Sequence, residues 1–277
     1  MKLTILGSGT GVPSGERNSA GYFLETGDVR LMMDCGAGTV HALARFGLPW
    51  KSMTHLFISH FHADHVAEMP ALMHAFKWGP SGRRTDRTEP LLIFGPAGID
   101  RVMAGFKHAL GDSLFELGFP LSIQILAPGD SAYLSSNCRL GVIKTPHTAE
   151  SLAVRIDSEG ASVCYTGDTA FSQDVADFFS GCGLMISECS FRERNPSVAH
   201  LSIEDVSQMA SRAGAARLLV THRYFEAADA ELKEALARHY SGQILIGRDG
   251  PPRQLPRQLR CPGSGGRNDA PCSGVRM

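Results

Sequence analysis

The chain has 277 residues, of which 43% are hydrophobic and 20% are charged, so it can bury the core of a full globular domain. Its formal net charge is −1, which gives no overall field that would attract a polyanion. Composition therefore excludes a disordered chain and does not favour nucleic acid as the substrate.

Residues 1–7 carry one lysine and few apolar residues before a glycine-rich turn, which is typical of a first strand and not of a signal peptide. No run approaches the roughly 18 apolar residues that a membrane span needs. The seven cysteines are scattered, odd in number and without CxxC spacing, so neither a disulfide framework nor a cysteine zinc site is indicated. We expect a cytoplasmic protein with reduced thiols and no membrane partner.

Short apolar runs bounded by Gly, Pro and Asp alternate with segments of helical period. The runs predict strands over residues 3–6, 21–26, 30–34, 55–59, 91–94, 121–126, 140–145, 152–156, 162–166, 184–188, 218–221 and 243–246. Helices are predicted over residues 38–46, 66–76, 98–110, 172–179, 203–213 and 228–239. Ser202 is the expected N-cap of the fifth helix. This mixed order predicts an α/β protein with two sheets packed face to face and helices on the outside.

Two segments are irregular. Residues 79–90 are polar and basic and predict an exposed loop. The basic residues in and beside it could border a substrate pocket, although a solvated surface is favoured; they are Lys77, Arg83, Arg84 and Arg87. Everything after residue 250 is rich in Pro, Gly and Arg. We therefore expect one catalytic domain over residues 1–250 and a disordered tail over residues 251–277.

Three histidines and an aspartate lie within six residues, directly after the predicted strand 55–59. They are His60, His62, Asp64 and His65. Side chains two apart in an extended segment share a face, so His60 and His62 can point at one metal, while Asp64 and His65 are carried toward a neighbouring position. A lone histidine is usually a packing residue, but burying so many ionisable groups would be costly without a cation. The segment therefore predicts two adjacent metals.

Further polar residues follow later strands at the point where each strand ends. His147, Asp168 and His222 each come just after an apolar run. Sheets of α/β proteins build sites from loops at such places, although each residue alone could equally be an aspartate cap or a turn histidine. Together with the first cluster they give seven ligands, enough for two metals that share Asp168 as a bridge. Imidazole and carboxylate ligands favour two divalent ions, zinc first and manganese or iron as alternatives.

These residues resemble the motifs of the metallo-β-lactamase superfamily. Its HxHxDH signature is met by His60, His62, Asp64 and His65, and its later motifs are similar to His147, Asp168 and His222. The resemblance spans about residues 2–249 and implies an αββα sandwich, with two mixed β-sheets flanked by helices. It also implies that one metal is bound by His60, His62 and His147, the other by Asp64, His65 and His222, and that Asp168 lies between them.

Within the superfamily the chain most resembles the ribonuclease Z-like phosphodiesterases. The marks are LGSGTGVP at residues 6–13, the DCG turn at residues 34–36, Ser59 before the signature, and IFGP at residues 93–96. Glu188 and His200 resemble the pair that handles protons in that branch, which makes His200 the candidate general acid and Glu188 the residue that steadies it. A purely structural hydrogen-bonded pair is the alternative.

The chain departs from the transfer-RNA-processing members of the branch in two places. His147 and Asp168 are 21 residues apart, which leaves no room for the long basic arm that those members carry there. Ser14-Gly15 also stands where the branch often has a lysine. Small, cyclic or aryl phosphodiesters are therefore favoured, and nucleic acid is left open but not favoured.

The resemblance implies a binuclear metal-dependent hydrolase in which a metal-bridging hydroxide, oriented by Asp64, attacks phosphorus and His200 protonates the leaving oxygen. The catalytic residues predicted are thus Asp64, His200 and Glu188, and the partner is a small anionic or ester substrate. The alternatives are an acyl hydrolase acting on a lactone, thioester or β-lactam, an RNA 3′-processing endonuclease, and a metal-binding sensor without turnover. A homodimer is left open, because relatives often pair through the segment after the signature helix.

Overall fold

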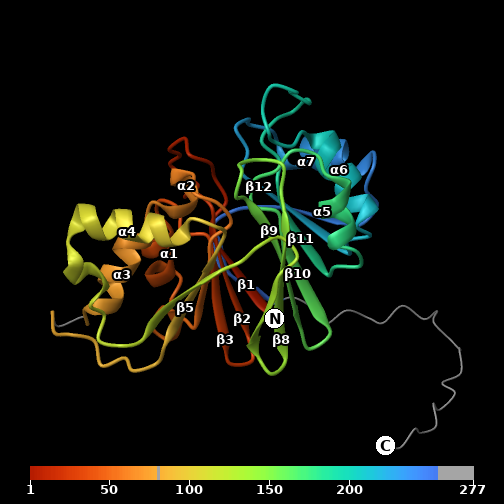
Figure 1. Cartoon of the computed structure of the whole chain (residues 1–277). Helices are drawn as coiled ribbons and strands as arrows, with labels where there is room; N and C mark the ends of the chain where they lie inside the picture. The colour runs from red at the N-terminus through yellow and green to blue at the C-terminus, as the bar shows by residue number, and fades with distance from the viewer. Residues whose placement is uncertain (80–81, 255–277) are drawn as a thin grey trace, which may run out of the picture.

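A computed structural model describes residues 1–79 and 82–254, which form two seven-stranded mixed sheets (Figure 1). The first sheet has the strand order β14-β1-β2-β3-β4-β5-β6. Its strands are β1 (Lys2–Gly7), β2 (Gly21–Thr26), β3 (Val29–Met33), β4 (His55–Phe57), β5 (Leu91–Gly95), β6 (Leu121–Ile125) and β14 (Gly250–Gln254). The second sheet has the order β13-β12-β11-β10-β9-β8-β7. Its strands are β7 (Ser131–Ser135), β8 (Cys138–Lys144), β9 (Leu152–Ser158), β10 (Ala161–Tyr165), β11 (Leu184–Glu188), β12 (Arg217–Thr221) and β13 (Gln243–Ile246).

Helices cover the outer side of each sheet (Figure 1). Those beside the first sheet are α1 (Thr39–Arg45), α2 (Ala63–Val66), α3 (Met69–Lys77) and α4 (Ile99–Leu110), with the short 3-10 turns η1 (Trp50–Ser52) and η2 (Asp112–Phe115). Those beside the second sheet are α5 (Gln173–Phe178), α6 (Ile203–Arg212) and α7 (Asp229–Ala237). The predicted αββα sandwich is therefore confirmed.

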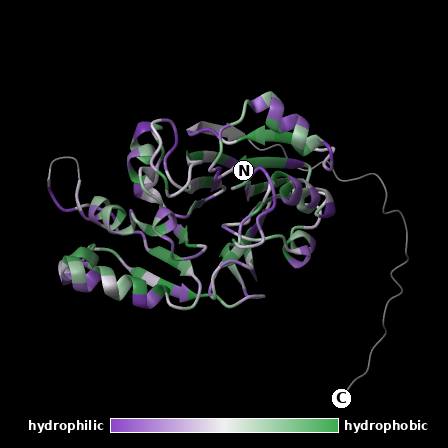
Figure 2. Ribbon diagram, turned by 90° about the horizontal axis from the view of Figure 1, so that it is seen from above, coloured by the Kyte–Doolittle hydropathy of each residue, from purple (hydrophilic) through white to green (hydrophobic). Residues whose placement is uncertain are grey.

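The core has three parts, one between the sheets and one beneath each set of helices. Leu31 and Phe57 of the first sheet and Val154 and Ile186 of the second are fully buried in the cluster between the sheets. Two further clusters lie beneath α1 to α4 and beneath α5 to α7. Figure 2 shows hydrophobic residues along the strands. Strands buried on both faces form continuous apolar runs, which is why the sequence pattern located them.

Each predicted strand is present, with ends within two residues of the prediction. Two strands were not predicted: β7, whose sequence SAYLS has no apolar run, and β14, which contains two prolines. Both lie at the edge of a sheet, where a polar strand or a proline is tolerated. The helix predicted over residues 66–76 is instead two helices, α2 and α3, because Pro70 stands in the first turn of α3 and fits only the start of a helix.

The first residues of the segment predicted as a disordered tail, residues 251–277, are instead part of a strand. Residues up to Gln254 belong to β14, which pairs antiparallel with β1 through Lys2 and Gln254. The rest of the predicted tail, residues 255–277, lies outside the described residues. Within the part of the chain that the structure describes, no helix is long and apolar enough to cross a membrane, and the five cysteines are buried and free.

Candidate metal centre

The signature histidines His60 and His62 lie in the extended segment between β4 and α2. His60 is fully buried, whereas His62 is exposed and is the N-cap of α2. Both rings contact the ring of His147, with centroid distances of 4.9 and 4.8 Å. Phe61, between them, packs against the cluster beneath α1 to α4. The alternation of an extended segment therefore brings the two histidines to one place, as predicted.

Asp64 and His65 lie inside α2 and face a different neighbour. The buried ring of His65 lies 5.6 Å from the ring of His222, centroid to centroid. Nε2 of His222 lies 3.1 Å from Oδ2 of Asp64. The start of α2 thus directs these two side chains toward His222 instead of His147.

Three strand ends of the second sheet supply the remaining predicted ligands. His147 follows β8, Asp168 follows β10 and His222 follows β12. Because β10, β11 and β12 run parallel, their carboxyl ends meet at one edge of the sheet. Gly167 has a φ of 56°, and a Cβ there would lie 2.9 Å from Cβ of Ser59. Glycine at this position therefore lets Asp168 approach the signature segment.

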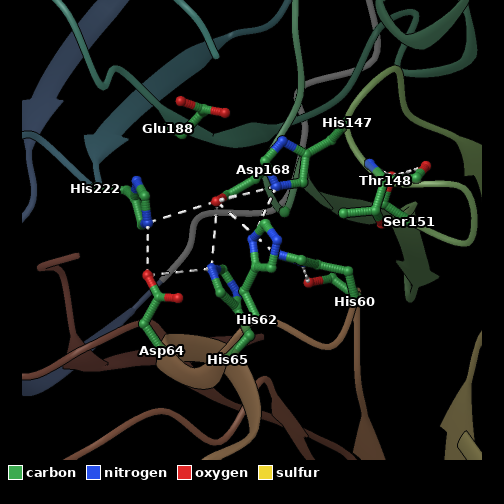
Figure 3. Close-up of polar contacts among 12 residues, drawn as sticks. His60, His62, Asp64, His65, His147, Thr148, Ser151, Asp168, Glu188 and His222 are labelled. Carbon is green, nitrogen blue, oxygen red and sulfur yellow. Dashed lines mark hydrogen bonds and ion pairs between the residues drawn. The ribbon is translucent and has the colours of Figure 1, made fainter. Parts of the chain in front are cut away.

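Asp168 lies between two groups of side chains (Figure 3). We call His60, His62 and His147 the first group, and Asp64, His65 and His222 the second group. Oδ2 of Asp168 lies 3.8 Å from Nε2 of His60 and 3.8 Å from Nε2 of His147. On the other side, Oδ1 lies 3.4 Å from Nε2 of His65, and Oδ2 lies 3.6 Å from Nε2 of His222. The structure thus brings all seven side chains together, in the two sets that the resemblance implies.

The atoms at this centre suit divalent metal ions. Nε2 of His60, Nε2 of His65 and Oδ1 of Asp168 are buried and have no hydrogen-bond partner within residues 1–79 and 82–254. Each such atom costs ~1–3 kcal/mol in a protein interior. Imidazole nitrogen and carboxylate oxygen are common ligands of divalent ions, so bound cations would satisfy all three atoms. The ligand set does not select one metal.

Asp34 at the end of β3 orients the signature segment and was assigned no role from the sequence. Its carboxylate is fully buried and accepts four hydrogen bonds. The donors are the backbone N–H of Ser59 (2.7 Å), the Ser59 hydroxyl (2.8 Å), Nδ1 of His65 (2.6 Å) and the Tyr165 hydroxyl (2.7 Å). A carboxylate bonded to Nδ1 fixes the ring and leaves Nε2 for a metal. The sequence contains a signal for this role, because Asp34 follows an apolar strand just as Asp168 does.

The first group is oriented by neutral partners. Nδ1 of His147 lies 2.8 Å from the carbonyl oxygen of Ala199, which can only accept, so Nδ1 carries the proton. The Ser59 hydroxyl donates to Asp34 and therefore accepts from Nδ1 of His60 at 3.0 Å. In both rings Nε2 is the nitrogen that keeps a lone pair.

Glu188 and His200 form the predicted hydrogen-bonded pair. Nδ1 of His200 lies 3.0 Å from each carboxylate oxygen of Glu188, which is buried at the end of β11. Glu188 also accepts from the backbone N–H of Thr169 at 2.7 Å and from the Ser190 hydroxyl at 2.5 Å. The capping box of α6, built on Ser202 as predicted, begins two residues beyond His200. The Glu188 carboxylate thus holds the imidazole of His200 through Nδ1, and the capping box fixes the backbone that follows it. Nε2 of His200 remains available to a substrate.

Ser190 links this pair to the second group and was missed from the sequence. Its hydroxyl donates to Glu188 and accepts from Nδ1 of His222 at 3.1 Å. His222 itself has a φ of 52°, which is strained for a histidine, and its backbone N–H donates to the carbonyl oxygen of Ser8 at 2.9 Å. Asp249 in turn accepts from the backbone N–H and the hydroxyl of Ser8, both at 2.9 Å. Asp249 thus ties the N-terminal loop to the site, and nothing in the local sequence pattern indicates this.

The electrostatics differ between the two groups. Burial lowers the pKa of His60 and His147, and the charge of Asp168 does not compensate. Burial is the largest single influence on His65 and His222 and opposes their protonation, but the combined charges and hydrogen bonds of the carboxylates around them outweigh it and raise the pKa of both. Asp168 acts on both rings, with Asp34 for His65 and Asp64 for His222. Without metal, the surroundings of His60 and His147 therefore favour the neutral imidazole, and those of His65 and His222 favour the protonated form.

Burial would also lower the pKa of His200, but its hydrogen bond to Glu188 and the charges of Glu188 and Asp168 raise it above the usual range. A raised pKa favours the protonated form of His200. This is the state that a general acid needs before it donates.

The segment between His147 and Asp168, where the spacing leaves no room for a long arm, is short. Between His147 and Asp168 the chain forms only the loop 145–151 and the antiparallel pair β9 and β10. Lys144 holds this loop through the carbonyl oxygens of Thr145 and Thr148. The absence of a long arm here, inferred from the spacing, is confirmed.

The basic residues near the loop 79–90 have structural partners. Lys77 donates to the carbonyl oxygen of Ser113 at 2.5 Å, and Arg84 to that of Glu116 at 2.5 Å. Arg87 donates to four backbone carbonyl groups and stacks on aromatic rings. These three cations therefore fix the loop to its surroundings.

Comparison with known proteins agrees with this geometry. Residues 1–237 match the family model described as Anti-Pycsar protein Apyc1. The probable metallo-hydrolase YhfI of Bacillus subtilis is 25% identical over 90% of this chain and 98% of its own length. Its crystal structure matches 91% of this chain and 98% of that chain with a TM-score of 0.77.

A ribonuclease Z of Halorubrum lacusprofundi is 27% identical over 92% of this chain and 97% of that protein. A diphosphatase from the PhnP family is 16% identical and shares the fold, with a TM-score of 0.71 over 94% of this chain and 99% of that chain.

These likenesses confirm the predicted metallo-β-lactamase fold and the resemblance to ribonuclease Z-like proteins. The chain is a metal-dependent hydrolase with a histidine and aspartate cluster that can bind divalent ions. Because the family model matches residues 1–237, the chain belongs to the family of the Anti-Pycsar protein Apyc1, within the metallo-β-lactamase fold.

Proposed function

We propose that this protein is a binuclear metal-dependent phosphodiesterase that cleaves small, cyclic or aryl phosphodiesters. The observation that carries the proposal is the His200–Glu188 pair beside the two ligand groups, because a fixed proton donor there serves a poor leaving group such as an alkoxide. Two of the similar proteins are named for phosphorus chemistry, as a ribonuclease and a diphosphatase, which supports phosphorus over carbon as the reacting centre.

The first group would hold one ion and the second group another, with Asp168 between them. We propose zinc, with manganese or iron as alternatives. Two such ions supply hydroxide near neutral pH and stabilise the charge of a transferred phosphoryl group.

The protein's own side chains position the substrate and move the proton. Asp64 engages His222 through Oδ2, which leaves Oδ1 to accept a hydrogen bond from the attacking water. Glu188 occupies Nδ1 of His200, so Nε2 is the atom that donates to the leaving oxygen. The roles of Asp64 and His200 are both assigned to the atom that has no protein partner among the residues described, since Oδ2 of Asp64 and Nδ1 of His200 are already hydrogen bonded.

The shape of the chain around the centre supports a small substrate. No arm leaves the segment between His147 and Asp168 to hold a folded RNA, and the net charge of −1 offers no general attraction for a polyanion. RNA is therefore the less favoured substrate.

Parallel assays of bis(p-nitrophenyl) phosphate, a lactone and a thioester test the proposal, with bound metal quantified in the same sample. We expect turnover of the phosphodiester to exceed that of both acyl substrates. Asp168→Ala removes the ligand shared by both groups and should abolish metal content and turnover together. Faster turnover of the lactone or thioester would contradict the proposal in favour of an acyl hydrolase.

His200→Ala tests the proton donor separately. Metal content should stay at the wild-type level, whereas turnover should fall by roughly 10²-fold, more for alkyl than for aryl leaving groups. Full activity of this variant on both kinds of ester would show that His200 is not the general acid.

A further inference from the structure

A second pocket adjoins the metal centre, between the N-terminal loop that follows β1 and the loop that follows β12. It has a volume of about 240 Å³. The residues that matter for its chemistry are Thr10, Val12, Arg17, Arg223, Tyr224 and Glu226. None of them belongs to the two ligand groups.

The pocket lies on the side of the centre where a leaving group would depart. The ring of Tyr224 lies 6.3 Å from the ring of His200 and 5.6 Å from that of His222, centroid to centroid. In the N-terminal loop, between the lining residues Thr10 and Val12, a Cβ added to Gly11 would lie 3.5 Å from the carboxylate of Asp64. A substrate whose leaving oxygen reaches His200 therefore extends past Tyr224 toward this pocket.

Arg223 is the unusual residue of the pocket. It is only 6% exposed, and neither Nη1 nor Nη2 has a hydrogen-bond partner among the residues that the structure describes. Its guanidinium carbon lies 5.7 Å from the ring centroid of Phe225. Burying a guanidinium without an acceptor is costly, because each donor loses its bond to water.

Arg17 adds a second positive charge from the N-terminal loop, on the other side of the pocket from Arg223. It forms no ion pair or side-chain hydrogen bond within residues 1–79 and 82–254. Burial and the nearby charge of Arg17 lower the pKa of Arg223, which shows that the two guanidinium groups repel each other. Glu226 is the one carboxylate that lines the pocket, so two cations face one anion.

We propose that this pocket is an anion subsite of the active site, which holds a second oxyanion of the substrate, a phosphoryl or carboxylate group carried by the leaving group. Arg223 lines the pocket, and an oxyanion held there would supply the acceptors that Nη1 and Nη2 lack. Arg17 contributes charge from the loop. The inference rests on the proposed phosphodiesterase function and specifies the substrate as a phosphodiester with a further negative charge.

The experiment uses a matched set of methyl aryl phosphates. The aryl leaving group carries at its meta position a carboxylate, a phosphonate or a neutral carboxamide, and product phenol is quantified by chromatography. For the wild-type metal-loaded enzyme we expect KM of the anionic substrates to lie roughly tenfold or more below that of the carboxamide, with similar kcat. Comparison of the KM values of the carboxylate and phosphonate substrates shows which oxyanion the pocket prefers.

Arg223→Gln should reduce the KM preference to within about twofold, and Arg17→Gln, at a more exposed position, should reduce it in part. Arg139→Gln is the control, because Arg139 is a surface residue of the β7–β8 hairpin, far along β8 from His147. Thermal unfolding and metal content are measured for each variant. If Arg223→Gln does not fold, the Arg17 variant still decides the outcome.

Two outcomes separate this inference from the proposed function. Equal KM values for all three substrates in the wild type, or a preference that survives in both arginine variants, would overturn the subsite while leaving the phosphodiesterase intact. If no phosphodiester is cleaved, calorimetric titration with the product phenols still tests the subsite: 3-hydroxyphenylphosphonate should bind at least tenfold more tightly than 3-hydroxybenzamide in the wild type but not in Arg223→Gln. Equal binding of the two phenols would overturn it.

Discussion

The two ligand groups contain similar residues but differ in the charge that supports them. In the first group, Nδ1 of His60 and of His147 contact a hydroxyl and a backbone carbonyl group. In the second group, His65 contacts the carboxylate of Asp34, and His222 is linked through Ser190 to that of Glu188. Burial therefore lowers the pKa of His60 and His147, whereas the carboxylates around His65 and His222 together outweigh burial and raise the pKa of those two rings. Metal ions bound at these two groups of similar residues should therefore differ in how strongly they compete with protons for the histidine nitrogens.

The pH dependence of metal binding is the largest expected consequence. The raised pKa values of His65 and His222 favour their protonated forms, so an ion in the second group must compete with a proton at each ring. Below those pKa values its affinity should fall by up to roughly 100-fold per pH unit, tenfold for each proton. His60 and His147 have lowered pKa values, so the first group should keep its ion at lower pH.

Equilibrium dialysis followed by elemental analysis, at steps between about pH 8 and pH 6, measures this difference. We expect the metal content to fall from two ions per chain toward one before the last ion is lost. Simultaneous loss of both ions would show that the two groups do not differ in the way the charges indicate.

Asp34→Asn should remove most of the difference between the groups. The amide cannot accept from all four donors, and His65 loses its carboxylate partner. We expect the affinity of the second group for metal to fall by roughly 10–100-fold and the free energy of unfolding to fall by about 3 kcal/mol. Metal titration and thermal unfolding measure the two effects.

Tyr165→Phe is the matched control for Asp34→Asn, because it removes one donor to Asp34 and leaves His65 bonded. An equal loss of metal affinity in both variants would contradict the role assigned to the bond between His65 and Asp34.

Glu188→Gln should affect turnover more than metal content. The amide still fills the space but no longer stabilises the protonated His200, so we expect kcat to fall by roughly tenfold or more while both ions stay bound. The basic limb of the pH–rate profile should also move to lower pH, because the pKa of His200 falls toward its usual value and the general acid loses its proton earlier. Glu204→Gln, at the exposed start of α6, is the control. Loss of metal from Glu188→Gln without a change in the pH profile would make Glu188 a purely structural residue.

Ser190→Ala should give the smallest effect. Nδ1 of His222 loses its acceptor, whereas Glu188 keeps Thr169 and His200 as partners. We therefore expect a several-fold loss of metal affinity in the second group and little change in kcat once both ions are bound. Metal titration followed by assays at saturating metal separates the two quantities. A larger loss of kcat than of affinity would show that Ser190 serves His200 more than His222.

The sequence by itself determined the strands, the sandwich and the residue types of the centre. Apolar runs locate strands that are buried on both faces, and four ionisable residues within one short segment indicate a metal because their burial needs a cation. The polar edge strand β7 and the proline-containing β14 escaped detection, because edge strands need no apolar pattern.

Only the tertiary structure decided which residues support the centre and what lies beside it. Asp34 and Ser59 are 25 positions apart in the chain, and Ser8 and Asp249 are 241 apart, yet each pair is hydrogen bonded. Local periodicity carries no information about such contacts, because they depend on how the two sheets pack. The unpaired guanidinium of Arg223 is also invisible in the sequence, since a residue's lack of a partner is a property of everything folded around it.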